Sequence, residues 1–203
     1  MRLNEVWNSY QTTIECLKVV ARVVKRKDIS VLDKANFIGA PVEEAAGRVS
    51  SSTEHAGDYV ILALWTLFER YLFLHLQKES KRMLQVSTTS FTQETQQKIE
   101  NKLEYWCVNE VLDLFKMMIG SNLIGQAKQV KQYKDWVAHR NPKKPSKTNV
   151  PLQTAYVVLS TVVWQLEAHP DVRGAVPRRP NKALHRTASS VSTIKAQKIQ
   201  LES

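Results

Sequence analysis

Apolar residues recur every three or four positions along much of the chain, a spacing that is typical of helices packed on one face. The first such pattern covers residues 4–27, with apolar positions from Val6 to Val24. Proline is absent from the interiors of these patterned stretches and glycine is rare in them, which favours helix over strand. We therefore predict helices over residues 4–27, 92–119, 123–139 and 151–168.

The segment that follows the first of these helices is less regular. Residues 28–56 contain Gly39, Pro41, Gly47 and the polar run 50–53, so we predict a loop with one short helix at residues 42–48. Gly57 and Asp58 then offer an N-terminal cap for a helix over residues 59–77.

The predicted helix over residues 59–77 is apolar nearly all round, so we place it at the centre of a bundle. Glu69 and Arg70 interrupt its most apolar stretch, residues 59–76, which falls short of a comfortable bilayer span. The expected fold is all-α: an antiparallel helical bundle of four long helices plus a short one, formed by residues 1–169. Residues 170–203 lose all periodicity, and we predict that they form a disordered basic tail.

The net charge of +10 is concentrated in two segments. Residues 128–147 hold seven Lys or Arg against one Asp, and residues 170–203 hold seven against two acidic residues. The rest of the chain is nearly neutral. This distribution favours a polyanionic partner, with nucleic acid ahead of a membrane surface, and charge kept for solubility is the alternative.

Signals for a metal or a cofactor are absent from the sequence. The five histidines share no helix-face spacing with each other or with Cys16 and Cys107. Glycine-rich phosphate loops and the nucleophile-elbow motif do not occur either, so we expect no cofactor and no metal. Two cysteines without a partner pattern, in a chain whose start lacks a signal-peptide core, suggest a cytoplasmic protein with no membrane partner.

Residues 133–142 hold the strongest candidate chemistry, with Lys134, Asp135, His139 and Arg140 at the end of a helix. His139 stands in the last predicted turn, where the helix dipole favours a positive charge and the surrounding lysines oppose it. Lys134 and His139 are five residues apart and do not share a face of a continuous helix. They meet only if the last turn distorts or if a second subunit supplies one of them.

This segment resembles the motif of the HEPN superfamily, in which an arginine, a polar residue and a histidine end a late core helix. Lys134, Asp135 and His139 stand in these places, followed by a basic loop and a final apolar helix. Residues 65–72 (WTLFERYL) resemble the first core helix of that family, which often holds an acidic residue after an aromatic one. The resemblance covers residues 55–168.

The resemblance implies a metal-independent endoribonuclease of the toxin or phage-defence type, acting as a homodimer in which two copies of the motif meet. In that mechanism His139 would transfer protons and a cation would stabilise the phosphorane. Asp135 would orient the histidine or the cation, and the products would carry a 2′,3′-cyclic phosphate. Lys134 replaces the arginine of the motif and lacks its planar fork, although Arg140 offers a guanidinium nearby. A non-catalytic HEPN-fold module that binds RNA or protein therefore remains open, as does an unrelated helical interaction protein.

Other residues extend the candidate site. Glu69 lies in the most apolar helix, so it needs a cation from another helix or a place in a cleft, unless it sits at the wet edge of the bundle. We expect Trp136 to pack and His75 to be structural. The lysines that could track an RNA backbone, or form a solvated face, are Lys128, Lys131, Lys143, Lys144 and Lys147.

Residues 179–188 (RPNKALHRTA) resemble a string at the C-terminus of unrelated short bacterial reading frames, where it comes from translation of a mobile repeat. The resemblance implies that residues 170–203 are separate from the fold and that the gene lies in mobile DNA. That setting fits a toxin or defence role with an antitoxin partner.

Overall fold

The computed structural model describes residues 3–27, 39–86, 89–103, 105–139 and 149–168. Every regular element within these ranges is a helix, which confirms the all-α prediction. The described residues up to Leu166 form one compact unit. The predicted disordered tail, residues 170–203, lies outside the described residues.

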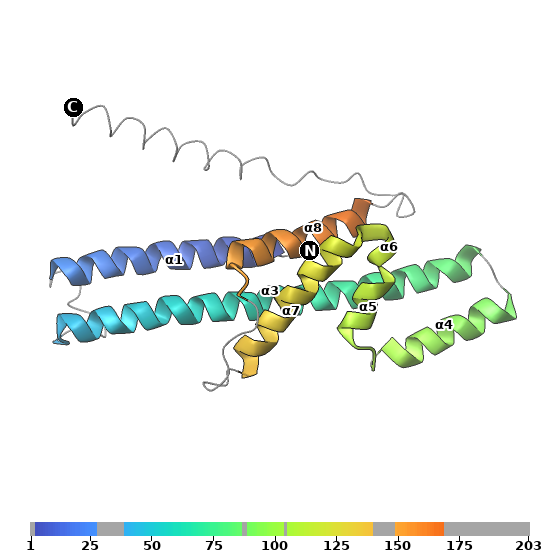
Figure 1. The fold of residues 1–203 in the computed structure, drawn as a ribbon, viewed down its shortest axis with the longest axis horizontal. Helices are drawn as coiled ribbons and strands as arrows, with labels where there is room; N and C mark the ends of the chain where they lie inside the picture. Colours follow the sequence, from blue (N-terminus) through green and yellow to red (C-terminus); the bar gives the residue numbers. More distant parts are fainter. Residues whose placement is uncertain (1–2, 28–38, 87–88, 104, 140–148, 169–203) are drawn as a thin grey trace, which may run out of the picture. The chain divides into compact units, whose positions relative to one another are not determined.

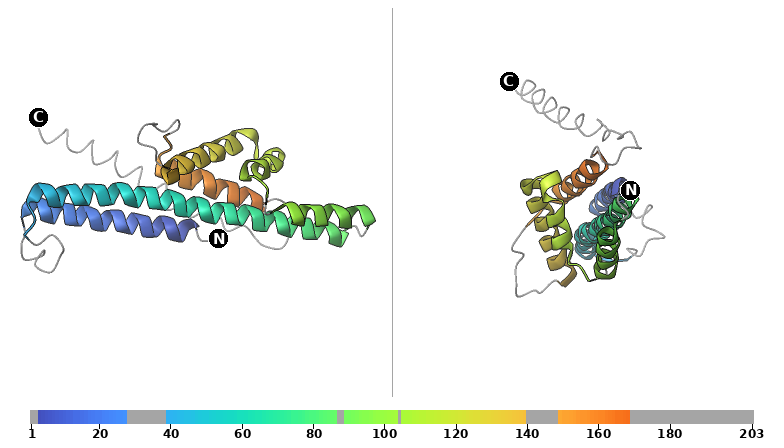
Figure 2. Two further views of the ribbon diagram at one scale, coloured as in Figure 1. Left: turned by 90° about the horizontal axis from the view of Figure 1, so that it is seen from below. Right: turned by 90° about the vertical axis from the view of Figure 1, so that its right-hand side faces the viewer.

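Helices α1 (Leu3–Arg26) and α3 (Val42–Val86) form a long antiparallel hairpin (Figures 1 and 2). Helix α1 matches the predicted helix over residues 4–27 and buries Leu3, Trp7 and Val24. Trp7 stacks on Tyr156 of α8 (Leu152–Ala168), with ring centroids 4.9 Å apart. The N-terminal half of α1 therefore packs against α8 as well as α3.

Helix α3 is one continuous helix of 45 residues. Residues 42–48 and 59–77 are helical as predicted, but the loop predicted between these two helices is wrong. Residues 28–38 of the predicted loop lie outside the described residues. Gly47 and the serine run indicated a loop because these residues have low helix propensity. Their polar groups are accommodated within the helix: the hydroxyl of Thr53 donates to the carbonyl of Val49 at 2.9 Å. Packing of Ala45 and Val49 beside α1 outweighs the weak local propensity.

Gly57 lies inside α3 and is buried, so it does not cap a helix as predicted. A Cβ atom added at Gly57 would lie 3.2 Å from Cδ1 of Leu152, at the start of α8. The missing side chain therefore lets α8 approach α3 closely at this point.

The predicted helix over residues 92–119 is divided into α4 (Ser90–Leu103), α5 (Val108–Leu114) and α6 (Lys116–Ile119). The apolar periodicity runs through the break, which is why the sequence indicated a single helix. The break is stabilised by Glu110, whose carboxylate accepts a hydrogen bond from the backbone N–H of Cys107 at 3.2 Å. A separate α5 can then pack against the middle of α3, while α4 lies along the end of α3 (Figure 2).

Helices α7 (Ser121–His139) and α8 lie within two residues of their predicted ranges. Gly120, with φ of 96°, separates α6 from α7 in a conformation that favours glycine. Five of the twelve largest fully buried side chains come from α3, more than from any other helix, which agrees with its predicted central place. These side chains include Ile61, Leu64, Trp65, Phe68, Leu72, Leu112, Ile124, Leu159 and Leu166.

His75 is buried in α3 beside α5, as its predicted structural role requires. Its ring stacks on Tyr71 and lies 5.7 Å from the ring of Phe115. Burial lowers the pKa of His75 below its ordinary value, although the carboxylate of Glu79 opposes this shift. His75 is therefore a neutral packing residue between α3 and the start of α6.

Cys16 and Cys107 are both free and both exposed. Cys107 lies in the break before α5. Cys16 lies on the outer surface of α1.

Because α3 is continuous, it is longer than the sequence suggested. Residues 42–82 contain an 18-residue window with a mean hydropathy of 1.3, enough to cross a membrane by length and composition. This corrects the expectation that the apolar stretch falls short. A buried core helix passes the same test, so the finding is weak evidence for a membrane, and the cytoplasmic location stays a prediction.

Candidate functional site

Helices α3 and α7 meet at Trp65 and Lys134. The ammonium nitrogen of Lys134 lies 5.7 Å from the centroid of the Trp65 ring, within the range of a cation–π contact. Trp65 is only 1% exposed, so the face that Lys134 contacts is part of the protein core. The Lys134 side chain is itself 20% exposed. Lys134 is thus a packed residue, with its charge directed along the seam between two helices.

Asp135 binds two lysines at once. Its Oδ1 lies 2.7 Å from Nζ of Lys134, and its Oδ2 lies 2.6 Å from Nζ of Lys131. Burial raises the pKa of Asp135, but the hydrogen bonds from Lys131 and Lys134 lower it by more, so the pKa of this carboxyl lies below its ordinary value. Asp135 was expected to orient either His139 or the cation, and of these two groups it is Lys134 that it binds.

Glu69 completes the arrangement from the side of α3. One of its carboxylate oxygens accepts a hydrogen bond from the indole N–H of Trp65 at 3.1 Å. The sequence suggested a cation from another helix or a cleft, whereas this partner is one turn earlier on the same helix. We call Trp65, Glu69, Lys131, Lys134 and Asp135 the α3–α7 cluster. It brings together three of the predicted catalytic residues, and it is held by tertiary packing.

Replacing Asp135 by asparagine is expected to lower the free energy of unfolding at neutral pH by about 0.5–1 kcal/mol, because the ion pairs are partly exposed. A carboxyl with a depressed folded pKa stabilises the fold above its unfolded pKa of about 3.9 and loses this contribution as pH falls through the folded pKa. The difference between the two proteins should therefore shrink in acid. Urea denaturation at about pH 7 and about pH 2.5 measures it. An equal difference at both pH values would contradict the assignment of this stability to the charged Asp135.

His139 lies apart from the α3–α7 cluster. It is the last residue of α7, and its side chain is exposed. Because α7 is one continuous helix from Ser121 to His139, Lys134 and His139 remain on different faces. Arg140, the other candidate cation, lies outside the described residues. A single chain therefore does not bring Lys134 and His139 together.

The lysines of α7 that were expected to contact RNA are paired with acids. Both carboxylate oxygens of Asp113 on α5 accept hydrogen bonds from Nζ of Lys128, each at 2.7 Å. Lys131 is bound to Asp135. Pairs this exposed contribute little, about 0–1 kcal/mol, so phosphate could displace the acids at small cost. The other three predicted RNA-binding residues, Lys143, Lys144 and Lys147, lie outside the described residues.

Two residues of this region, Trp65 and Asp113, were not singled out as site residues from the sequence. Trp65 stands four residues before the predicted Glu69, a spacing that places both on one helix face and could have indicated their hydrogen bond. Asp113 pairs with Lys128 across two helices, and no local spacing predicts such a contact. Trp136 packs against the core and stacks on Tyr133 at 6.0 Å, which confirms its predicted packing role.

Metal chemistry gains no candidate from the geometry. Among the residues with described positions, no group of three or more His, Cys, Asp or Glu side chains could hold a metal ion.

No protein-family model, no curated protein and no solved structure matches the chain. Membership of the HEPN superfamily therefore stays a prediction, resting on the residues from Lys134 to His139 and on the order of the helices. What the chain does must be argued from its own residues.

Proposed function

We propose that this protein binds RNA through the C-terminal end of α7 and the basic segment that follows it, and that it does so without cleaving the strand. By the basic segment we mean residues 140–147, which contain Arg140, Lys143, Lys144, Lys147 and no acidic residue. Four cations within eight residues, directly after the exposed His139 in the sequence, suit a flexible polyanion. The lysines of α7 add further phosphate contacts if their acids are displaced.

The proposal that the protein does not cleave RNA rests on the contacts that Lys134 makes in the α3–α7 cluster. In metal-independent RNA cleavage, a cation must stabilise charge on the phosphorane while a base removes the 2′-hydroxyl proton. Here Lys134 binds Asp135 and lies on the ring of Trp65. Its charge is held by these two contacts on a face of α7 that differs from the face of His139, so Lys134 serves the fold and is not the partner cation of His139 within one chain.

Cleavage is the second candidate, and the exposure of His139 at the end of α7 is what favours it. A second copy could place its Arg140 beside His139, which would restore a histidine and a guanidinium at one phosphate. The toxin or defence setting and an antitoxin partner would belong to this candidate. They rest on the resemblances of the motif and of residues 179–188 alone.

A gel assay of the full chain with mixed cellular RNA in EDTA separates the two candidates. We expect RNA that is retarded on a native gel and intact on a denaturing gel, for the wild type and for His139→Ala alike. EDTA-resistant cleavage by the wild type, lost in a folded His139→Ala variant, would replace the binding function by the nuclease. Unretarded, intact RNA at low salt would refute both.

A further inference from the structure

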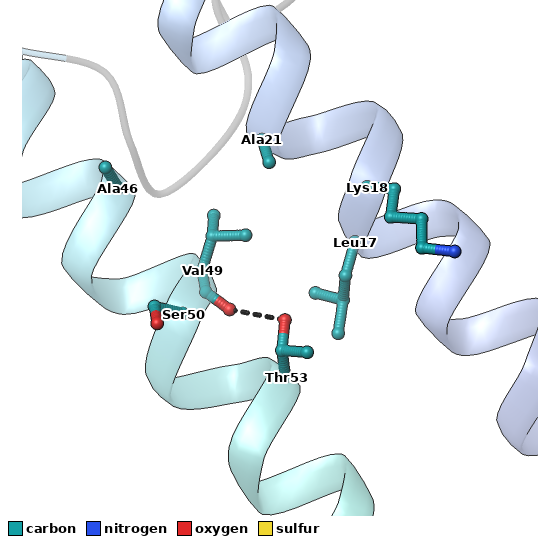
Figure 3. Close-up of a pocket in the computed structure, with 7 residues that line it drawn as sticks. All are labelled: Leu17, Lys18, Ala21, Ala46, Val49, Ser50 and Thr53. Atoms are coloured by element: carbon teal, nitrogen blue, oxygen red, sulfur yellow. Dashed lines mark hydrogen bonds between the residues drawn. The ribbon is translucent and has the colours of Figure 1, made fainter.

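The outer half of the α1–α3 hairpin contains an open apolar groove. The groove encloses about 210 Å³ and runs along the seam between the two helices (Figure 3). Small side chains leave it open: Ala21 from α1, and Ala46, Ser50 and Thr53 from α3, are all exposed. Leu17 and Val49 form the apolar walls. In the described part of the chain, α8 covers α1 near Trp7 and α3 near Gly57, and neither contact reaches this groove.

The two rims of the groove carry opposite charge. On α1, residues 16–27 hold five Lys or Arg and no acid. On α3, residues 43–58 hold four acids and one arginine. Lys18 and Lys25 flank Ala21 at helical spacing, so they lie on the groove side of α1. Glu43 precedes Ala46 by three residues and lies on the groove side of α3 in the same way.

From this groove and its charges we infer that the α1–α3 hairpin is the docking surface for a second copy of this chain. Two hairpins related by a two-fold axis along the hairpin form a four-helix bundle. Each α1 then lies between its own α3 and the α3 of the second copy. Every neighbouring pair of helices is antiparallel, and every new contact sets the basic rim of α1 against the acidic rim of α3.

Charge complementarity selects a second copy as the occupant. A partner helix of uniform charge would be repelled by one of the two rims, whereas the hairpin presents both signs in the order that its own copy requires. The small residues leave space in the seam that the partly exposed Leu17 side chains of both copies can fill from opposite sides. The groove of one chain thereby becomes half of a bundle interior.

This surface differs from the dimer that the motif resemblance implies, which would join the two copies at the ends of α7. It uses α1 and α3 and contains no residue of α7. The inference is therefore independent of whether the protein binds RNA, and the two can fail separately.

Ser50→Arg tests the docking surface, with Ser51→Arg as its matched control. Both serines are exposed in α3, but only Ser50 lines the groove, so both variants should fold. An arginine at position 50 would bury an unpaired guanidinium between the copies, which weakens the dimer at least about tenfold. Sedimentation equilibrium of the full chain measures the dissociation constant, and circular dichroism checks helix content. A monomeric wild type, or a dimer that Ser50→Arg leaves as tight as Ser51→Arg does, would overturn the inference.

A charge exchange tests the rims. Lys25→Glu and Glu43→Lys should each weaken the dimer, because each places like charges opposite one another. The double variant should recover most of the wild-type dissociation constant, since the attraction is restored with its signs reversed. A double variant no tighter than the weaker single variant would show that these rims do not face each other across two copies, and would overturn the proposed arrangement.

Discussion

Replacing Trp65 by alanine is expected to lower the free energy of unfolding by about 3–5 kcal/mol, the range typical of a large buried aromatic residue. Trp65 is 1% exposed and belongs to the main core cluster, to which α3 contributes Ile61, Leu64, Phe68 and Leu72 as well. The substitution removes the indole N–H that donates a hydrogen bond to Glu69 and the ring face on which Lys134 lies. It therefore opens a cavity and dismantles the α3–α7 cluster at once.

Trp164→Ala is the control for this prediction. Trp164 is 39% exposed on α8, so the same change of side chain there should cost markedly less. Urea unfolding followed by circular dichroism gives both free energies. A third variant, Trp65→Phe, retains an aromatic ring but not the N–H. Its loss of unfolding free energy should be smaller, because it removes only the hydrogen bond to Glu69 and part of the ring volume. Equal losses for Trp65→Ala and Trp164→Ala would contradict the central position of Trp65.

Replacing Lys143, Lys144 and Lys147 together by glutamine is expected to reduce the affinity for single-stranded RNA about 100-fold at about 0.1 M salt. The estimate follows from counterion release, which contributes a slope of about 0.7 per phosphate contact in a plot of log affinity against log salt. Three lost contacts should lower that slope by about 2. Fluorescence anisotropy with a labelled oligonucleotide at several salt concentrations measures the affinity and the slope together.

The matched control changes the same charge elsewhere. Lys78, Lys98 and Lys116 are exposed on α3, α4 and α6, and their replacement by glutamine also removes three positive charges. If affinity followed net charge alone, both triple variants would weaken binding equally. We expect the control to retain most of the wild-type affinity, because it leaves the basic segment intact.

Sequence patterns predicted the helices whose periodicity is uninterrupted and whose ends are marked by strong signals. Helix α7 follows Gly120 and α8 begins directly after Pro151, and both were placed within two residues. The failures arose where local and tertiary effects conflict. Gly47 and the serine run indicated a loop on local propensity, but packing against α1 keeps α3 helical.

The opposite error occurred at residues 105–107, where the apolar period continues through a break. Periodicity reports which residues face the core, and it does not report whether the backbone stays straight between them. The interaction that marks the start of α5, from Glu110 back to Cys107, spans only three residues. It could have been recognised as a capping signal, although cysteine is an unusual residue at that position.

The candidate site was predicted in part. The sequence indicated Lys134, Asp135 and Glu69, and the structure places all three in the α3–α7 cluster. The roles assigned to them depended on which face of α7 packs on α3, which a single helix pattern does not determine. His139 was predicted near the end of α7 and lies there, exposed and on another face.

Ultraviolet crosslinking of the full chain to RNA, followed by mass spectrometry of the crosslinked peptides, tests the proposed function most directly. The positive charge of the chain is concentrated in residues 128–147 and in residues 170–203, and only the first of these stretches belongs to the proposed site. We expect the crosslinked peptides to come from residues 131–147, including the peptide that contains His139. Crosslinks confined to residues 170–203, or the absence of crosslinks at low salt, would contradict RNA binding at the end of α7.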